Sequence, residues 1–99
     1  MLFAVTWVNR GTGSEDMERR SLKMFSNWKP PAGVEFKTFY DYADASGGTA
    51  LVESSSAEGL LETMAPWATF FNFTCRPVVA ADAGAAIFNK GVAWRDSVR

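Results

Sequence analysis

The sequence predicts an α+β fold in which a four-stranded antiparallel sheet carries two helices on one face and is followed by a C-terminal helix. Three observations lead to this class. Four short segments rich in β-branched and aromatic residues are separated by segments with helical spacing. Capping residues, prolines and glycines mark their ends. The 99 residues are 47% hydrophobic and 21% charged, which is typical of one domain, here residues 1–99, with a buried core.

The first strand and the first helix are expected near the start of the chain. Residues 2–9, LFAVTWVN, have the composition and length of a strand. Ser14 suits an N-cap, because its hydroxyl can accept from a free backbone N–H of the first helical turn. Pro30 and Pro31 end the helix. Its apolar face has three-and-four spacing and consists of Met17, Ser21, Met24, Phe25 and Trp28.

A hairpin is predicted next. Residues 34–42 alternate with the period of two that is typical of a half-buried strand. Residues 43–48, ADASGG, have turn composition, and residues 49–53, TALVE, form the returning strand. The first of these strands is expected to carry Val34, Phe36, Thr38, Tyr40 and Tyr42 on one face and Glu35, Lys37, Phe39 and Asp41 on the other.

A second helix is expected after the hairpin. Ser55 and Glu58 have the spacing of a capping box, in which each side chain accepts from the other residue's free backbone N–H. Pro66 limits or bends the end of this helix. Its apolar stripe consists of Ala57, Leu60, Leu61, Met64, Ala65 and Ala68.

The fourth strand and a C-terminal helix complete the pattern. In residues 70–79, FFNFTCRPVV, either alternate set of side chains can face the helices, and both choices leave large apolar groups on the other side. Asp82 suits the N-cap of the last helix. The apolar face of that helix consists of Ile87, Gly91, Trp94 and Val98.

The order β-α-β-β-α-β is the ferredoxin-like arrangement, which leaves one face of the sheet without helices. Strand 2–9 is apolar on both faces, since Phe3, Val5 and Trp7 alternate with Leu2, Ala4, Thr6 and Val8. A contiguous exposed apolar patch usually marks an interface. A second copy is the simplest partner, because most soluble oligomers are twofold dimers. We therefore expect a homodimer through the open sheet face.

The composition excludes several partners and cofactors. Ten basic and eleven acidic residues give a net charge of −1 and are scattered, which argues against nucleic acid. The apolar runs fall far short of the roughly 20 residues that span a membrane. There is no histidine, so imidazole zinc sites, histidine-ligated haem and Ser-His-Asp catalysis are excluded, and we expect no metal or cofactor. One cysteine and no secretory leader favour the cytoplasm.

Four stretches are similar to a known family: WKPPAGVEF at 28–36, TALVESSSAEGLLE at 49–62, APWATFFNFTCRPVV at 65–79 and AWRDSV at 93–98. Nearly the whole chain resembles a small bacterial domain family of unknown function in the dimeric α/β-barrel superfamily. The resemblance implies a homodimer in which two sheets close into a barrel, and it implies no catalytic residues. Cofactor-free monooxygenases, haem-degrading enzymes, lactone isomerases and dye-decolorising peroxidases of that superfamily are similar in fold alone, which does not carry function.

Five residues are candidates for a ligand site: Trp7, Tyr40, Tyr42, Asn72 and Arg76. Aromatic walls with few polar groups are typical of small-molecule cavities, here between the sheet and the helices. The alternative is packing in a dimer interface, which uses the same residue types. The Arg76 guanidinium needs either a ligand carboxylate or a structural partner, for which the candidates are Glu35, Asp41 and Glu53.

Other reactive side chains favour structural roles. Cys75 lacks a histidine that could activate it and is expected to be an inert thiol. The spacing of Asp41, Asp44, Glu53 and Asp82 matches no metal motif, and Asp44 suits a turn. The sequence thus favours a homodimeric binding or assembly domain with a small apolar ligand. One alternative is a cofactor-independent oxygenase or isomerase that acts on a hydrophobic or aromatic substrate. Another is a subunit that presents its C-terminal helix to a different protein.

Overall fold

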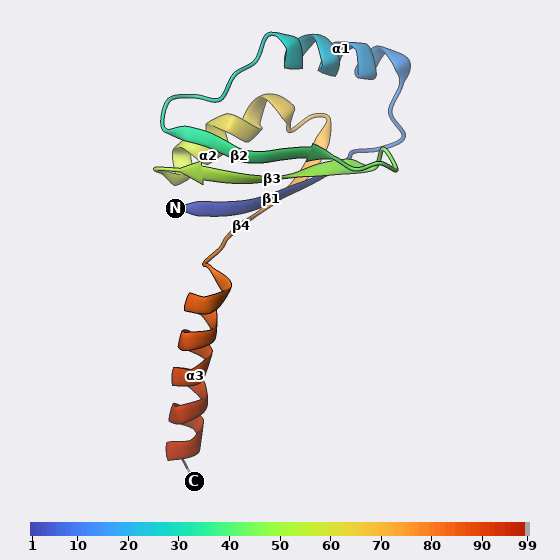
Figure 1. The fold of residues 1–99 in the computed structure, drawn as a ribbon. Helices are drawn as coiled ribbons and strands as arrows, with labels where there is room; N and C mark the ends of the chain where they lie inside the picture. Colours follow the sequence, from blue (N-terminus) through green and yellow to red (C-terminus); the bar gives the residue numbers. More distant parts are fainter. Residues whose placement is uncertain (99) are drawn as a thin grey trace.

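The computed structural model describes residues 1–98, and these contain one four-stranded antiparallel sheet in the order β2-β3-β1-β4 (Figure 1). The helices α1 and α2 lie on one face of this sheet, whereas α3 extends from its other side. This is the ferredoxin-like arrangement that the sequence predicts. The elements are β1 (Leu2–Asn9), α1 (Glu15–Ser26), β2 (Val34–Asp41), β3 (Gly47–Ser54), α2 (Ala57–Met64), the 3₁₀ turn η1 (Ala65–Trp67), β4 (Phe71–Pro77) and α3 (Ala81–Ser97).

The helix α1 begins where the sequence predicts. Ser14 is its N-cap, and the Ser14 hydroxyl accepts from the backbone N–H of Met17 at 3.1 Å. Acidic residues in the first turn and Lys23 in the last complement the helix dipole. The half-buried face of α1 contains Met17, Ser21 and Met24, as expected, so α1 turns its predicted apolar side towards the sheet.

The starts of the other two helices each differ by one or two residues from the prediction. Ser56, not Ser55, caps α2 and accepts from the Gly59 N–H at 3.0 Å. Ser55 is held outside the helix, because its own N–H donates to the Gly33 carbonyl at 3.2 Å. Likewise Ala80 is the N-cap of α3, since its carbonyl accepts from the Gly84 N–H at 2.9 Å. Asp82 therefore lies in the first turn, where its carboxylate favours the dipole.

An irregularity in β2 changes which side chains share a face. Phe36 pairs with Val52 and Thr38 pairs with Leu51, so that the pairing register shifts at Lys37. The extra residue of such a bulge reverses the alternation that follows it. Phe39 therefore joins Phe36 on the helix side, and Tyr40 faces the opposite way. The unbroken alternation predicted over residues 34–42 is wrong from Thr38 onwards.

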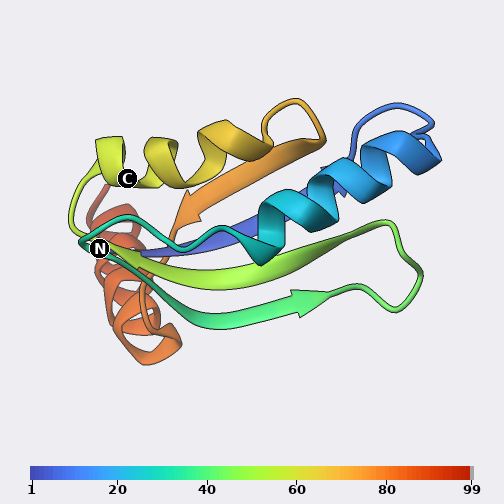
Figure 2. The same cartoon turned by 90° about the horizontal axis from the view of Figure 1, so that it is seen from above.

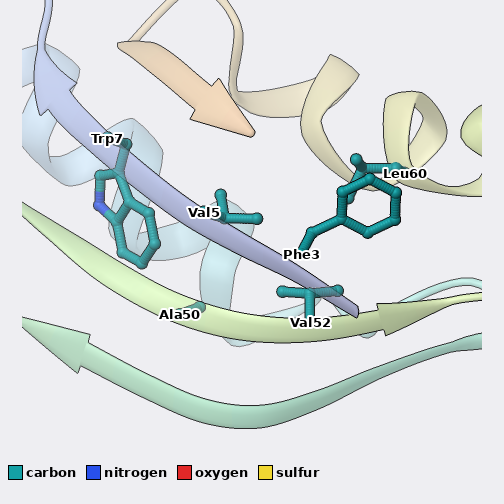
Figure 3. Packing of buried hydrophobic residues seen from close by; sticks show 6 residues of the cluster. All are labelled: Phe3, Val5, Trp7, Ala50, Val52 and Leu60. Atoms are coloured by element: carbon teal, nitrogen blue, oxygen red, sulfur yellow. The ribbon is translucent and has the colours of Figure 1, made fainter. Parts of the chain in front are cut away.

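The core lies between the sheet and α2. Its buried side chains come from alternate positions of β1 and β3 and from one residue of α2 (Figure 3). This burial excludes water from apolar surface and supplies the main driving force for folding. The core cluster consists of Phe3, Val5, Trp7, Ala50, Val52 and Leu60.

The pairing of β4 decides which of its two sets of side chains faces the helices. Trp7 pairs with Phe73 and Val5 pairs with Cys75, so these β4 residues share the helix side with the core. The alternate residues Asn72, Thr74 and Arg76 are exposed on the other face. That face lies on the α3 side of the sheet in Figure 1 and points away from the viewer in Figure 2, and it is called the open face below.

The close approach of β3 to Trp7 requires a glycine. A Cβ atom at Gly48 would overlap the Trp7 ring and the Tyr40 carbonyl. We expect Gly48→Ala to lower the free energy of unfolding by about 1–3 kcal/mol, because overpacking forces the ring or the strand to shift. Urea unfolding measures this change. The neighbouring Thr49→Ala adds no atoms and should cost about 1 kcal/mol or less. Equal stability of Gly48→Ala and the wild type would contradict this packing.

Candidate functional site

A cavity of about 230 Å³ lies between the sheet and the helices α1 and α2. Its walls are mainly aromatic and come from both helices, η1 and the strands β1, β2 and β4. Small-molecule sites have this character, a mostly apolar enclosure with a few polar groups, although they are usually roughly 300–1,000 Å³. The aromatic lining residues are Trp7, Phe25, Trp28, Phe36, Phe39, Trp67, Phe71 and Phe73.

Rings from separate elements contact one another around this cavity. The ring centroids of Phe25 and Phe39 are 5.7 Å apart, and those of Trp28 and Trp67 are also 5.7 Å apart, both edge to face. Trp7 meets Phe39 edge to face at 5.5 Å. Such pairs contribute about 0.5–1.5 kcal/mol each beyond their buried area. The rings thereby connect α1 and η1 to the sheet.

The helix α1 forms a loosely held roof over the cavity. Every residue of α1 is at least partly exposed, and the Phe25 side chain, which lines the cavity, is 50% exposed. Leu22, a second lining residue, is 61% exposed. Few buried apolar contacts are typical of the least stable parts of a fold. A small movement of α1 would therefore admit a ligand without disturbing the sheet.

The side-chain oxygens of the cavity are few and serve as hydrogen-bond acceptors. Asp41 is the one charged residue among the described residues that line it. The Ser21 hydroxyl donates to the Glu18 carbonyl at 3.0 Å, and the Thr63 hydroxyl donates to the Gly59 carbonyl at 2.7 Å. These two oxygens then have lone pairs left and no proton to give. The electrostatics favour a neutral or positively charged ligand over an anion.

Comparison with known proteins gives one match. The model of a domain of unknown function, DUF3303, matches residues 1–92. The chain belongs to the DUF3303 family. No curated protein and no solved structure matches it. The predicted membership of a domain family of unknown function is confirmed, and the DUF3303 match assigns no substrate and no site residue.

The DUF3303 structure distributes the predicted site residues over both faces of the sheet. Trp7 lines the cavity. Tyr40 lies on the open face and is 63% exposed, because the bulge at Lys37 turns it away from the helices. Arg76 is also on the open face, and Asn72 borders a second depression beside α2 and β4. Tyr42 follows β2 in the hairpin loop, where its N–H donates to the Gly47 carbonyl.

Sequence reasoning missed most of the aromatic wall. Phe25 and Trp28 were expected on the apolar face of the first helix and Phe36 on one face of a half-buried strand, but such positions are usual in any core, and no signal distinguished a cavity from close packing. Phe39 was assigned to the wrong face because a bulge has no clear sequence signature here. Trp67 belongs to η1, whose turn follows from Pro66 limiting α2.

The expected partners of Arg76 are engaged elsewhere or lie on the other face. The Glu53 carboxylate contacts the amino group of Met1 at 2.7 Å, and Glu35 pairs with Lys37 at 3.1 Å. Asp41 lies at the cavity. The exposed Arg76 guanidinium is therefore solvated in the single chain, and a second protein surface over the open face would have to accommodate it.

The remaining candidates have structural environments. Cys75 is half-buried, and burial raises the pKa of its thiol, which keeps it protonated and poorly nucleophilic near neutral pH. The Asp44 carboxylate accepts from the Ser46 hydroxyl at 2.6 Å and from its N–H at 3.0 Å, which lowers the Asp44 pKa and confirms its role in the turn. The described residues contain no group of three His, Cys, Asp or Glu side chains that could hold a metal ion.

Within residues 1–98, no helix is both long enough and apolar enough to cross a membrane.

Proposed function

We propose that residues 1–99 form one homodimeric binding domain that holds a small, mainly apolar ligand between the sheet and the helices α1 and α2. The main support for this proposal is the cavity, because eight aromatic residues line it and the helix α1 that covers it is partly exposed. Its volume of about 230 Å³ suits a ligand the size of one substituted ring. A cytoplasmic location stays a prediction from the single cysteine.

Binding is favoured over catalysis by the chemistry of the cavity. An oxygenase or isomerase that works without a cofactor needs a proton acceptor or donor directed at its substrate. Among the described lining residues Asp41 alone is ionisable, and it lies at an exposed position near the end of β2. The aromatic walls supply apolar contact area and ring faces, which are the contacts of a receptor for small molecules.

Filling the cavity should abolish binding. Benzyl alcohol is a neutral probe of suitable size, and NMR of the indole N–H groups measures its binding. We expect it to shift the signals of Trp7, Trp28 and Trp67, which line the cavity, and to leave that of Trp94 on α3 unchanged. Ser21→Trp should weaken this binding about tenfold or more, because the new side chain occupies the ligand volume.

Arg20→Trp is the matched control for this experiment. Arg20 is an exposed neighbour of Ser21 on α1 and lies outside the cavity lining. This variant should bind benzyl alcohol like the wild type. Equal affinity in the Ser21→Trp variant, or equal shifts of all four indole signals, would sink the cavity proposal.

The charge at Asp41 should select among ligands of the same shape. We expect benzylammonium to bind several-fold more tightly than benzoate, because ring faces and a carboxylate both attract a cation. Asp41→Asn should reduce this ratio, and added salt should reduce it further. Glu35→Gln, on β2 outside the cavity lining, makes the same change in net charge and should leave the ratio unaltered. A preference for benzoate would contradict this view of the cavity.

The proposed dimer joins two open faces, as in the dimeric α/β barrels that the sequence resembles. It is supported by the apolar residues that β1 and β3 present there, Leu2, Ala4, Val8 and Leu51. Covering them removes apolar surface from water at about 25 cal/mol per Å². In native mass spectrometry of gently purified protein we expect twice the chain mass of 10.9 kDa, with any retained ligand as an added mass. A monomer at micromolar concentration would refute the dimer.

A further inference from the structure

The helix α3 is an arm that stands away from the rest of the chain. It has 17 residues, or about 25 Å at 1.5 Å per residue, and follows the end of β4 after a short linker. Figure 1 shows it running away from the sheet on the side of the open face. The radius of gyration is 17.7 Å, whereas a compact domain of this length has about 13 Å.

The exposed side chains of α3 are unusually apolar. Phe88 is 78% exposed, Trp94 is 68% exposed and Ile87 is 59% exposed. At 100° per residue these three and Val92 fall within one side of about 160°, which also carries Gly84, Gly91 and the charged Arg95. The opposite side carries the polar residues Asp82, Asn89, Lys90 and Asp96. Four large apolar side chains, Ile87, Phe88, Val92 and Trp94, thus share one exposed side of α3 with a single charged residue, Arg95.

The chain exposes more surface than a compact monomer of its mass, and the excess has the size of a dimer interface. Its accessible surface is 7432 Å², whereas a compact monomer of 10.9 kDa exposes about 5,600 Å². The excess is about 1,800 Å² per chain, and two chains that lost it would bury about 3,600 Å². Obligate homodimers bury roughly 2,000–5,000 Å² in total, so one second copy of this chain accounts for the excess.

We propose that α3 is an exchanged arm whose apolar side packs against a second copy of this chain. This inference rests on the proposed homodimer and adds the element that fastens it. Two open faces packed face to face are about 10 Å apart. A helix of about 25 Å that leaves the open face therefore reaches past the facing sheet and lies along the flank of the second copy. A twofold axis makes the two arms equivalent and leaves neither unpaired.

Phe88→Glu tests the arm. Sedimentation equilibrium of the full chain should show a wild-type dimer, and Phe88→Glu should raise the dimer dissociation constant about tenfold or more, because it replaces the most exposed large apolar side chain of α3 with a charge on the side proposed to be buried. Asn89→Glu places the same charge one residue further on, on the polar side of α3, and should leave the dissociation constant nearly unchanged.

The outcomes separate the arm from the other proposals. Selective loss of dimer in Phe88→Glu, with benzyl alcohol still bound in the cavity, supports the exchange. Dimers of equal strength in both variants would overturn the arm while leaving a dimer through the open sheets alone. A monomeric wild type, for example one in which α3 folds back on its own sheet, would overturn both the arm and the dimer. Ligand binding is measured separately and decides the cavity by itself.

Discussion

The bulge at Lys37 is the feature on which the helix side of this structure depends. It places Phe36 and Phe39 on the same side of β2, where their rings stack with centroids 4.9 Å apart. This pair contacts Trp28 and Phe25, the two large side chains near the end of α1. In regular alternation Phe39 would face the other way, and α1 would lose the ring contact at 5.7 Å that ties Phe25 to the sheet. The roof of the cavity thus follows from one extra residue in an edge strand.

The same aromatic packing explains why space remains beneath α1. Large rigid rings that meet edge to face hold elements apart at ring-to-ring distances, and they cannot adapt to fill an irregular gap as methionine or leucine can. The core under α2 is closed by smaller groups such as Val5, Val52 and Leu60. The fold therefore has a well-packed half, which supplies stability, and a ring-lined half with a loosely held roof, where a ligand can enter.

The sequence was sufficient for the order of elements, because periodicity and capping are local signals. Ser14 and the boundaries of β1 agree with the structure for this reason. Local signals were not sufficient to decide which side chains of β2 and β4 face the helices. The bulge in β2 and the pairing of Trp7 with Phe73 both depend on a distant strand. For the same reason the predicted site residues do not lie together: Trp7 lines the cavity, whereas Tyr40 and Arg76 lie on the open face. The projection of α3 also has no local signal, because an apolar helix side has the same pattern whichever chain covers it.

The strand β1 connects the two functional surfaces that we propose. Trp7 faces the cavity, while its neighbours Thr6 and Val8 face the open side of the same strand. Dimerisation would cover the open face without occupying the cavity, so that a ligand and a second copy do not compete. It would also pack against β1 and β3 on their open face, and thereby restrict the movement of the strand that carries Trp7. Ligand binding orders α1. If the dimer already holds β1 and β3 in place, binding costs less conformational entropy than in a monomer, where α1 and these strands must all be ordered, and this difference favours binding to the dimer.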